Sequence, residues 1–243
     1  MTMKKIHKSK LYRGDCLSIL DKIKDKSITL VLTDPPYWHN KGRSPAVIGE
    51  HTKLKTKLYD PEGDMVSKFS SFSPKKIKLF LNKLASKMKL MNCYFFCNDS
   101  QIATYGKWAE KNGFHFCVLA WRKPLSVINR NRFSQNIEFL CRIYDFGTAL
   151  NKLEDTSLYD RVLTDAPVVG CEKLHPTQKP ISICKKIIEL SSNEGDIVLD
   201  PFMGSGSTGV ACTHLNRKFI GIEMEKKYFK IACDRIEKSK GTF

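Results

Sequence analysis

The sequence lacks the features of a disulfide-bonded, metal-binding or membrane-spanning protein. Its nine cysteines are an odd number without a CxxC pair, and no His or Cys pair at zinc spacing accompanies Cys93 and Cys97. We therefore expect reduced, mostly buried thiols and no metal. No apolar run approaches the roughly 18 residues that a membrane span needs. The basic residues 1–10 are followed by no apolar signal segment, so we expect a cytoplasmic protein.

Acidic residues are scarce, since 25 Asp and Glu stand against 41 Lys and Arg, for a net charge of +16. Such an excess favours a polyanionic partner, most often nucleic acid, although a merely soluble basic protein would have the same composition. The 243 residues, 42% hydrophobic and 27% charged, are typical of a globular protein. They suffice for one large α/β domain with an insertion, or for one domain with a small lobe.

Short apolar runs alternate with helical patterns, which favours a parallel sheet covered by helices on both faces. Asp15 and Ser73 are expected helix N-caps, and Pro74 and Pro180 are expected first helical residues. Polar segments without periodicity are expected to be loops. The expected strands are 6–11, 28–32, 93–97, 114–121, 137–144, 197–199 and 219–222; the expected helices follow residue 15 and span 73–91, 103–111, 181–190 and 210–215; the expected loops are 38–64 and 145–171.

The first candidate site, Asp34-Pro35-Pro36-Tyr37, directly follows an apolar strand. The prolines remove two amide donors and hold the chain extended past the strand's carboxyl end, where open α/β sheets place ligands. The Asp34 carboxylate and the backbone carbonyls can accept hydrogen bonds from an amino group. The Tyr37 ring can stack on a flat ring. The alternative is an Asp-Pro turn with a packing tyrosine.

The second candidate site is the glycine-rich segment 200–209, which lies between a strand and a helix and contains Gly204-x-Gly206-x-x-Gly209. Glycines let the backbone approach a ligand, and Glu223 at the end of the next strand can hold ribose hydroxyls. We therefore expect a nucleoside-type cofactor. NAD is the default for this pattern, and a P-loop is disfavoured because no Lys-Ser/Thr follows. Asp200 suits the amino group of S-adenosylmethionine better than a pyrophosphate.

Basic residues gather in segment 38–64 and around the Arg-Asn cluster 129–132. Arg and Lys suit phosphates or guanine, whereas Asn and Gln suit adenine edges, so these segments are candidates for nucleic-acid contact. Ordinary solvated loops are the alternative. The residues expected to bind nucleic acid are Lys41, Arg43, Lys123, Arg130 and Arg132.

Residues 33–37 (TDPPY), 175–180 (HPTQKP) and 200–209, in this order, closely resemble motifs of the β group of amino-methylating DNA methyltransferases. Residues 13–16 and 222–223 resemble further segments of that family. The match is weak only over 38–64 and 123–171. The resemblance implies a circularly permuted, Rossmann-like α/β methyltransferase fold with a mostly parallel seven-stranded sheet, one strand antiparallel, and helices on both faces. Residues 1–122 would form its catalytic half, 123–174 a small target-recognition insertion, and 175–243 its cofactor-binding half.

The resemblance also implies the chemistry. The target base in double-stranded DNA would be flipped out of the stack. Asp34 and the Pro35 carbonyl would accept the two N–H bonds of its exocyclic amine, in a segment stiffened by Pro36, and Tyr37 would stack on the base. The methyl group would pass directly from the aligned sulfonium. S-adenosylmethionine would be bound by Asp15, Cys16, Asp34, Thr177, Lys179, Asp200, Phe202, Gly204, Ser205, Gly206 and Glu223.

Within the resembled family, Asp at the first position of the tetrapeptide favours adenine N6 over cytosine N4. No cysteine lies in the tetrapeptide, which argues against a cytosine-C5 mechanism with its cysteine nucleophile. Two other classes stay open, namely a catalytically silent DNA-binding protein with a nucleotide pocket and an NAD-dependent oxidoreductase. Some relatives form homodimers and some accompany a cognate restriction endonuclease. The sequence leaves both partners, and the recognition sequence, open.

Overall fold

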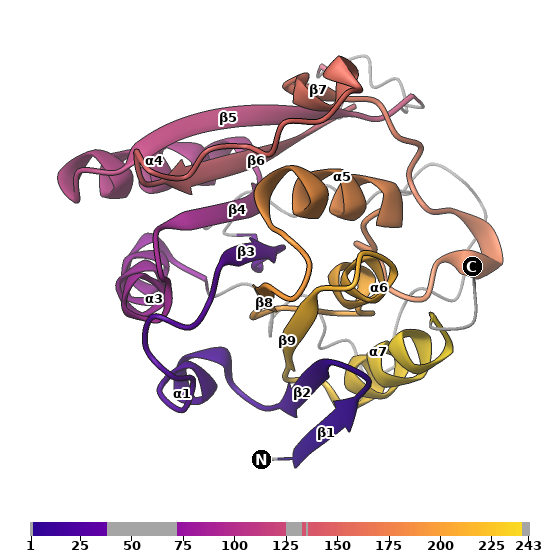
Figure 1. The fold of residues 1–243 in the computed structure, drawn as a ribbon. Coiled ribbons are helices and arrows are strands. Elements are labelled where there is room, and N and C mark those ends of the chain that lie inside the picture. Colours follow the sequence, from indigo (N-terminus) through magenta and orange to yellow (C-terminus); the bar gives the residue numbers. More distant parts are fainter. Residues whose placement is uncertain (1, 38–71, 125–132, 135, 240–243) are drawn as a thin grey trace.

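A computed structural model describes residues 2–37, 72–124, 133–134 and 136–239. Among these residues, nine strands form one sheet with the order β1-β2-β9-β8-β3-β4-β6-β5-β7 (Figure 1). The strands are β1 (Thr2–Ile6), β2 (Ser9–Arg13), β3 (Leu30–Thr33), β4 (Asn92–Cys97), β5 (His115–Arg122), β6 (Ile137–Tyr144), β7 (Val162–Leu163), β8 (Ile197–Asp200) and β9 (Lys218–Glu223).

The expected α/β fold with a mostly parallel sheet is confirmed, but the strand count differs from seven. Strands β2, β9, β8, β3 and β4 run parallel, and β6 lies antiparallel between β4 and β5. Among these seven strands, β6 is the single antiparallel strand, as expected. The short strands β1 and β7 extend the two edges, and β1 is a second antiparallel strand.

The expected single strand at 6–11 is wrong, because the chain turns back within it. Strands β1 and β2 pair as a hairpin in which Ile6 faces Ser9. His7, between them, has a positive φ of 50°, a conformation that ends an extended strand. Leu11 on β2 is fully buried, whereas β1 is exposed except at Ile6. The second strand of the hairpin therefore joins the core, and the first covers its edge.

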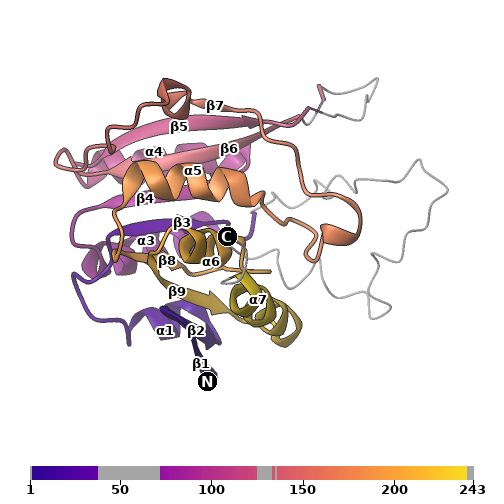
Figure 2. The same cartoon turned by 45° about the vertical axis from the view of Figure 1, so that its right-hand side comes forward.

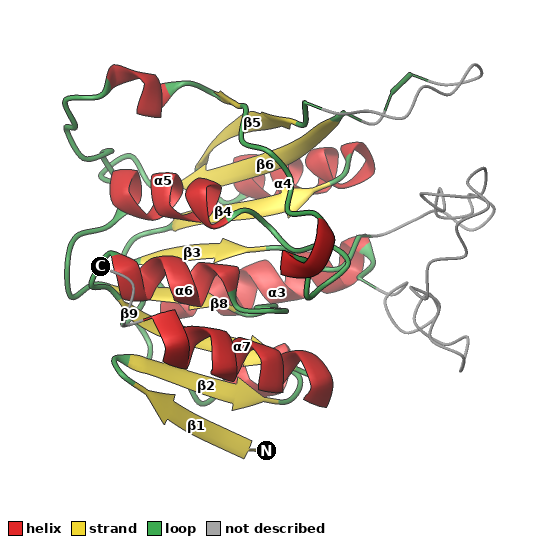
Figure 3. Cartoon of the chain, turned by 90° about the vertical axis from the view of Figure 1, so that its right-hand side faces the viewer, coloured by secondary structure: helices red, strands yellow, loops and turns green. Residues whose placement is uncertain are grey.

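Helices cover both faces of the sheet, as expected for alternating strands and helices. Helices α1, α3 and α4 pack on one face and α5, α6 and α7 on the other (Figure 1 and Figure 3). The last three follow one another across their face (Figure 2). The helices are α1 (Cys16–Leu20), α3 (Pro74–Lys87), α4 (Asp99–Lys111), α5 (Ile181–Ser191), α6 (Ser207–His214) and α7 (Lys226–Lys238), with 3₁₀ turns η1 (Thr156–Tyr159) and η2 (Gly170–Glu172).

Two predicted helix starts are confirmed by their hydrogen bonds. The Ser18 amide donates to Asp15 Oδ1 at 2.9 Å, and the Lys76 amide donates to Ser73 Oγ at 3.4 Å. Pro74 is the first residue of α3. Pro180, in contrast, is the N-cap of α5 and not its first helical residue. Helix α4 begins before the expected residue 103, because Asn98 and Gln101 form a capping box.

The parallel strands bring the candidate sites to one edge of the sheet. In the register, Arg13 at the end of β2 lies beside Glu223 at the end of β9, and Asp200 at the end of β8 lies beside Gly221. Strand β3 ends at Thr33 and pairs with β8. The segments after residues 13, 33, 200 and 223 therefore meet at the carboxyl edge, where open α/β sheets bind ligands.

The range 123–174 is part of the sheet, since it contributes β6 and β7. Its division from the rest of the chain as a target-recognition insertion stays a prediction. Within the described ranges, no helix is both long and apolar enough to cross a membrane. All nine cysteines are free, and seven of them are buried.

Candidate active site

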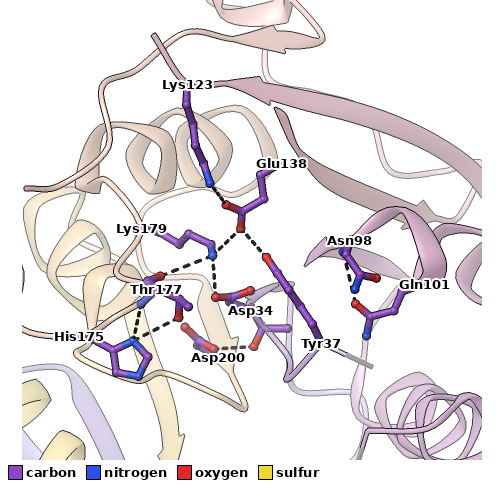
Figure 4. Close-up of polar contacts among 11 residues, drawn as sticks. Asp34, Tyr37, Asn98, Gln101, Lys123, Glu138, His175, Thr177, Lys179 and Asp200 are labelled. Atoms are coloured by element: carbon purple, nitrogen blue, oxygen red, sulfur yellow. Dashed lines mark hydrogen bonds and ion pairs between the residues drawn. The ribbon is translucent and has the colours of Figure 1, made fainter. Parts of the chain in front are cut away.

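Asp34 lies at the centre of the polar contacts at the carboxyl edge (Figure 4). Its Oδ2 is 2.6 Å from Nζ of Lys179. Its Oδ1 is buried and has no hydrogen-bond partner among the residues that the structure describes. Because a buried carboxylate oxygen without a partner is costly, such an atom in a native site indicates a missing donor. The described residues therefore satisfy only one oxygen of the Asp34 carboxylate.

Lys179 joins Asp34 to a second carboxylate, that of Glu138 on β6, which was not predicted from the sequence. Lys179 Nζ is 2.6 Å from Glu138 Oε1, and Lys123 Nζ is 2.8 Å from Glu138 Oε2. Although burial opposes charge on both groups, the carboxylates raise the pKa of Lys179 and the two ammonium groups lower the pKa of Glu138 to about 2. Burial raises the pKa of Asp34, and Lys179 opposes that rise. We call Asp34, Glu138, Lys123 and Lys179 the charge cluster.

The tetrapeptide after β3 is held at two further points. The Tyr37 hydroxyl donates to Glu138, and burial raises the pKa of this hydroxyl well above its usual value. Gln101 on α4 donates from Nε2 to the Pro36 carbonyl oxygen at 3.3 Å, and its Oε1 accepts from the Asn98 amide. These contacts fix the orientation of the tyrosine ring and of the backbone beside Asp34.

Asp200 lies behind Asp34 and links two neighbouring strands. Its Oδ1 accepts from the Thr33 hydroxyl at 2.6 Å and from the Phe202 amide at 3.1 Å. Burial raises the pKa of Asp200 to about 7. The Phe202 ring packs edge-on against Phe72 and Phe80, at centroid distances of 5.2 and 5.4 Å. Asp200 and Phe202 therefore anchor the start of the glycine-rich segment to β3 and to the α3 side of the core.

Glu223 organises the other end of this edge. Its Oε2 accepts from the Gly204 amide at 3.0 Å, and its Oε1 accepts from the Glu225 amide at 2.8 Å. The Gly14 amide donates to its backbone carbonyl, which places Asp15 and Cys16 next to it. Burial raises the pKa of Glu223 and of the Cys16 thiol, the latter to about 12. The predicted adenine and ribose residues are thus neighbours.

Two glycines of the second site pack against helix α7, and one of them, Gly206, also has a positive φ of 83°. A Cβ on Gly206 would lie 3.0 Å from the Ala232 Cβ, and one on Gly209 would lie 2.4 Å from Ile236 Cδ1. Ala232 and Ile236 belong to α7, which was not predicted from the sequence. Arg235 of the same helix donates to the Ser205 carbonyl oxygen at 2.7 Å and to Ser205 Oγ at 2.9 Å. Contacts with helix α7 therefore hold the glycine-rich segment in position.

Residues 175–180 cross from the glycine-rich segment to the charge cluster. His175 packs edge-on against Tyr228 at 4.2 Å and lies close to Gly204. Its Nδ1 accepts from the Thr177 amide at 3.2 Å. Burial lowers the pKa of His175 to about 4, so this ring is neutral near pH 7. Lys179 then reaches Asp34 from the same segment (Figure 4).

Most predicted site residues lie at this edge, and their individual roles stay predictions. Lys123 is in the charge cluster, whereas Lys41, Arg43, Arg130 and Arg132 lie outside the described residues. Sequence reasoning missed Glu138, Gln101 and Arg235. Of these, only Glu138 has a local signal, as an acidic residue near the start of a mostly apolar strand.

Comparisons with known proteins agree with this site. A sequence model of a DNA methylase family matches residues 147–234. The type II methyltransferase M2.DpnII of Streptococcus pneumoniae is 31% identical over 245 residues, covering 93% of this chain and 89% of that protein. M2.LlaDCHI of Lactococcus lactis subsp. cremoris, also a type II methyltransferase, is 31% identical over 246 residues, covering 94% and 89%.

Solved structures share the architecture. A complex of M1.HpyAVI with SAM is 27% identical, covers 94% of this chain and 99% of that chain, and superimposes with a TM-score of 0.66. The cytosine-N4-specific PvuII DNA methyltransferase has a TM-score of 0.74 over 95% of this chain and 87% of that chain. At 18% identity, this second likeness shows the fold alone.

The curated relatives match across nearly the whole chain. The NAD-dependent oxidoreductase does not account for that match. The chain therefore belongs to the DNA amino-methyltransferases, which transfer a methyl group from S-adenosylmethionine to an exocyclic amino group of a DNA base.

Proposed function

We propose that this protein methylates the N6 amino group of adenine in double-stranded DNA and that Asp34 is the acceptor for that amino group. The observation that carries the proposal is the buried Asp34 Oδ1, which has no partner among the described residues while Oδ2 pairs with Lys179. An N–H donor of the target base would satisfy this oxygen. The carboxylate is thus oriented by the protein and keeps one acceptor for substrate.

An exocyclic amine is a poor nucleophile because its lone pair is delocalised into the ring. Hydrogen bonds from its two N–H groups to Asp34 and to a backbone carbonyl favour the pyramidal nitrogen that attacks. The Pro36 carbonyl is engaged by Gln101, so we assign the second acceptor to the Pro35 carbonyl. Tyr37, whose hydroxyl is tethered to Glu138, would stack on the base. The base must leave the duplex to reach these groups.

The residues at the carboxyl edge fit S-adenosylmethionine, which supplies the methyl group as an electrophile. We assign the ribose hydroxyls to Glu223, whose oxygens each keep a lone pair after accepting one backbone N–H. Asp15 and Cys16 would border the adenine. We assign the methionine end to the side of Asp200, Gly204, Thr177 and Lys179. Ser205 and Gly206 face α7, so we infer that they shape the loop rather than contact the cofactor.

The choice of adenine rests on the Asp at the first position of the tetrapeptide, which in the resembled family accompanies adenine targets more often than Ser does. Cytosine N4 is the second candidate. Adenine and cytosine both present an amino group beside a ring nitrogen, so the contacts of Asp34 alone accommodate either base. The sequencing experiment described below therefore distinguishes adenine from cytosine as the target base.

The DNA would approach over the segments that hold the basic residues. Lys123, a member of the charge cluster, directly follows the last residue of β5. We propose residues 123–174 as the target-recognition region, with Lys41, Arg43, Arg130 and Arg132 as further DNA contacts. The two curated relatives are named type II methyltransferases, so a cognate restriction endonuclease is the first partner to test. Size-exclusion chromatography with light scattering would test for a homodimer.

The function is tested by expressing the chain in a bacterial host without DNA methylation and sequencing its genome with modification-sensitive reads. We expect N6-methyladenine at one short motif. N4-methylcytosine at a motif would overturn the adenine assignment and keep the reaction class. A genome without amino methylation, with the protein present and folded, would overturn the proposed function. A host that expresses Asp34→Asn is the matched control and should show unmodified DNA.

A further inference from the structure

The Glu138 carboxylate contacts three side chains, and none of these contacts is part of the β-sheet pairing of its strand. Its carboxylate accepts from the Tyr37 hydroxyl, lies 2.6 Å from Lys179 Nζ and lies 2.8 Å from Lys123 Nζ. These partners come from three separate segments, namely the tetrapeptide, residues 175–180 and the end of β5 (Figure 4). One carboxylate therefore holds the tyrosine ring and the lysine that pairs with Asp34.

The charge cluster is balanced only when Glu138 is present. Two ammonium groups, Lys123 and Lys179, face two carboxylates, Asp34 and Glu138. Without Glu138 the cluster would carry one excess positive charge. The methyl donor is a sulfonium cation, and the amino nitrogen becomes positive as it is methylated and before it loses a proton. An excess positive charge at this place would therefore oppose the reaction.

Resting on the proposed function, we propose that Glu138 is a positioning residue for methyl transfer, which keeps Lys179 and Tyr37 in place around Asp34 and balances the charge there. It acts through these residues and does not need to touch the substrate. A carboxylate at this position on β6 also ties the tetrapeptide to the strand that follows the Arg-Asn segment. Its loss should lower the rate of methyl transfer more than the binding of the methyl donor.

The pH dependence of the reaction separates this role from a merely structural one. Glu138 acts to raise the pKa of Asp34, so its neutralisation should lower that pKa. Asp34 would then ionise at lower pH, and the acid limb of the pH–rate profile would move to lower pH. The ionisable groups that interact with Asp34 from the surrounding elements are Lys179, Glu138, Tyr37, Asp200, Cys97 and Tyr105.

The experiment measures methyl transfer from tritiated S-adenosylmethionine to duplex DNA carrying the motif found in the genome, from pH 5 to 9. Glu138→Gln keeps the shape of the side chain and removes its charge. We expect kcat to fall about ten- to hundredfold, KM for the methyl donor to change little, and the acid limb to move to lower pH. Glu110→Gln, at an exposed position on α4, is the matched control and should behave like the wild-type protein.

Two outcomes would overturn the inference while the wild-type protein is active. One is a Glu138→Gln variant with the wild-type rate. The other is a reduced rate with an acid limb that does not move to lower pH, since general loss of structure gives that result. If Glu138→Gln does not fold, Tyr37→Phe takes its place, because it removes only the hydroxyl that donates to Glu138. A Tyr37→Phe variant with wild-type kcat would then overturn the inference. An inactive wild-type protein would instead contradict the proposed function.

Discussion

Asp34 and Lys179 stand 145 positions apart in the sequence, and their side chains meet at 2.6 Å. The pair joins the strand-end tetrapeptide to the segment before α5. Because Lys179 also contacts Glu138, the same ammonium group orients both carboxylates. The arrangement leaves Asp34 Oδ1 as the buried acceptor without a partner among the described residues.

Replacing Asp34 by Asn should abolish most methyl transfer and leave DNA binding intact. The amide is neutral, and it cannot stabilise the positive charge that develops on the amino nitrogen. Removal of such an electrostatic contact lowers kcat by about 100-fold or more. Single-turnover methylation and DNA-binding titrations at fixed salt measure the two properties. Asp234→Asn, at an exposed position on α7, should leave both unchanged, and an active Asp34→Asn variant would exclude the assigned role.

Replacing Lys179 by Met should destabilise the fold. The substitution leaves Asp34 without its ion-pair partner and leaves Glu138 with one ammonium group, that of Lys123. Removing one member of a buried pair costs about 3 kcal/mol of unfolding free energy. Lys83→Met breaks the more exposed pair with Asp21 and should cost about 1 kcal/mol or less. Urea unfolding compares the two variants, and equal losses would show that the Lys179 pair contributes no more than a surface pair.

His175 should make the fold less stable in acid. Its pKa is lowered to about 4 by burial, against about 6.5 in an unfolded chain. Because the unfolded state binds the proton more readily, this contribution to stability is fully present above about pH 6.5 and is lost as the pH falls toward 4. His175→Asn keeps an acceptor for the Thr177 amide and removes the titration. The difference in unfolding free energy between the two proteins should shrink from pH 7 to pH 4; a constant difference would contradict the burial of a neutral ring.

Gly209→Ala should destabilise the contact between α6 and α7. The added Cβ would lie 2.4 Å from Ile236 Cδ1 and 2.7 Å from the Phe219 ring. Overpacking of this kind costs about 1–3 kcal/mol of unfolding free energy. Gly147→Ala is the matched control, because its Cβ would meet Leu90 at an ordinary 3.6 Å. Thermal unfolding should give a lower midpoint temperature for Gly209→Ala than for Gly147→Ala. Equal midpoint temperatures would show that α7 accommodates the added Cβ without loss of stability.

Local sequence patterns were sufficient to predict many of the helices and strands. The caps Asp15 and Ser73 act within three residues of themselves, and the apolar face of α3 follows from its own spacing. The hairpin of β1 and β2 was not predictable in this way, because His7 adopts a left-handed conformation that its neighbours do not demand. Helix α7 was missed as well, although it shapes the glycine-rich segment through Arg235 and Ile236.

The sequence by itself determined which segments are the candidates for chemistry. A strand that ends in Asp34-Pro35-Pro36-Tyr37, and another that ends in a glycine-rich loop, are local patterns whose geometry depends on adjacent residues. Only the tertiary structure decided how their side chains are paired. Glu138 meets Lys179, Lys123 and Tyr37 because β6 inserts between β4 and β5. Ion pairs form wherever folding brings opposite charges together, so no spacing along the chain could have shown that Asp34 Oδ1 would have no partner among the described residues.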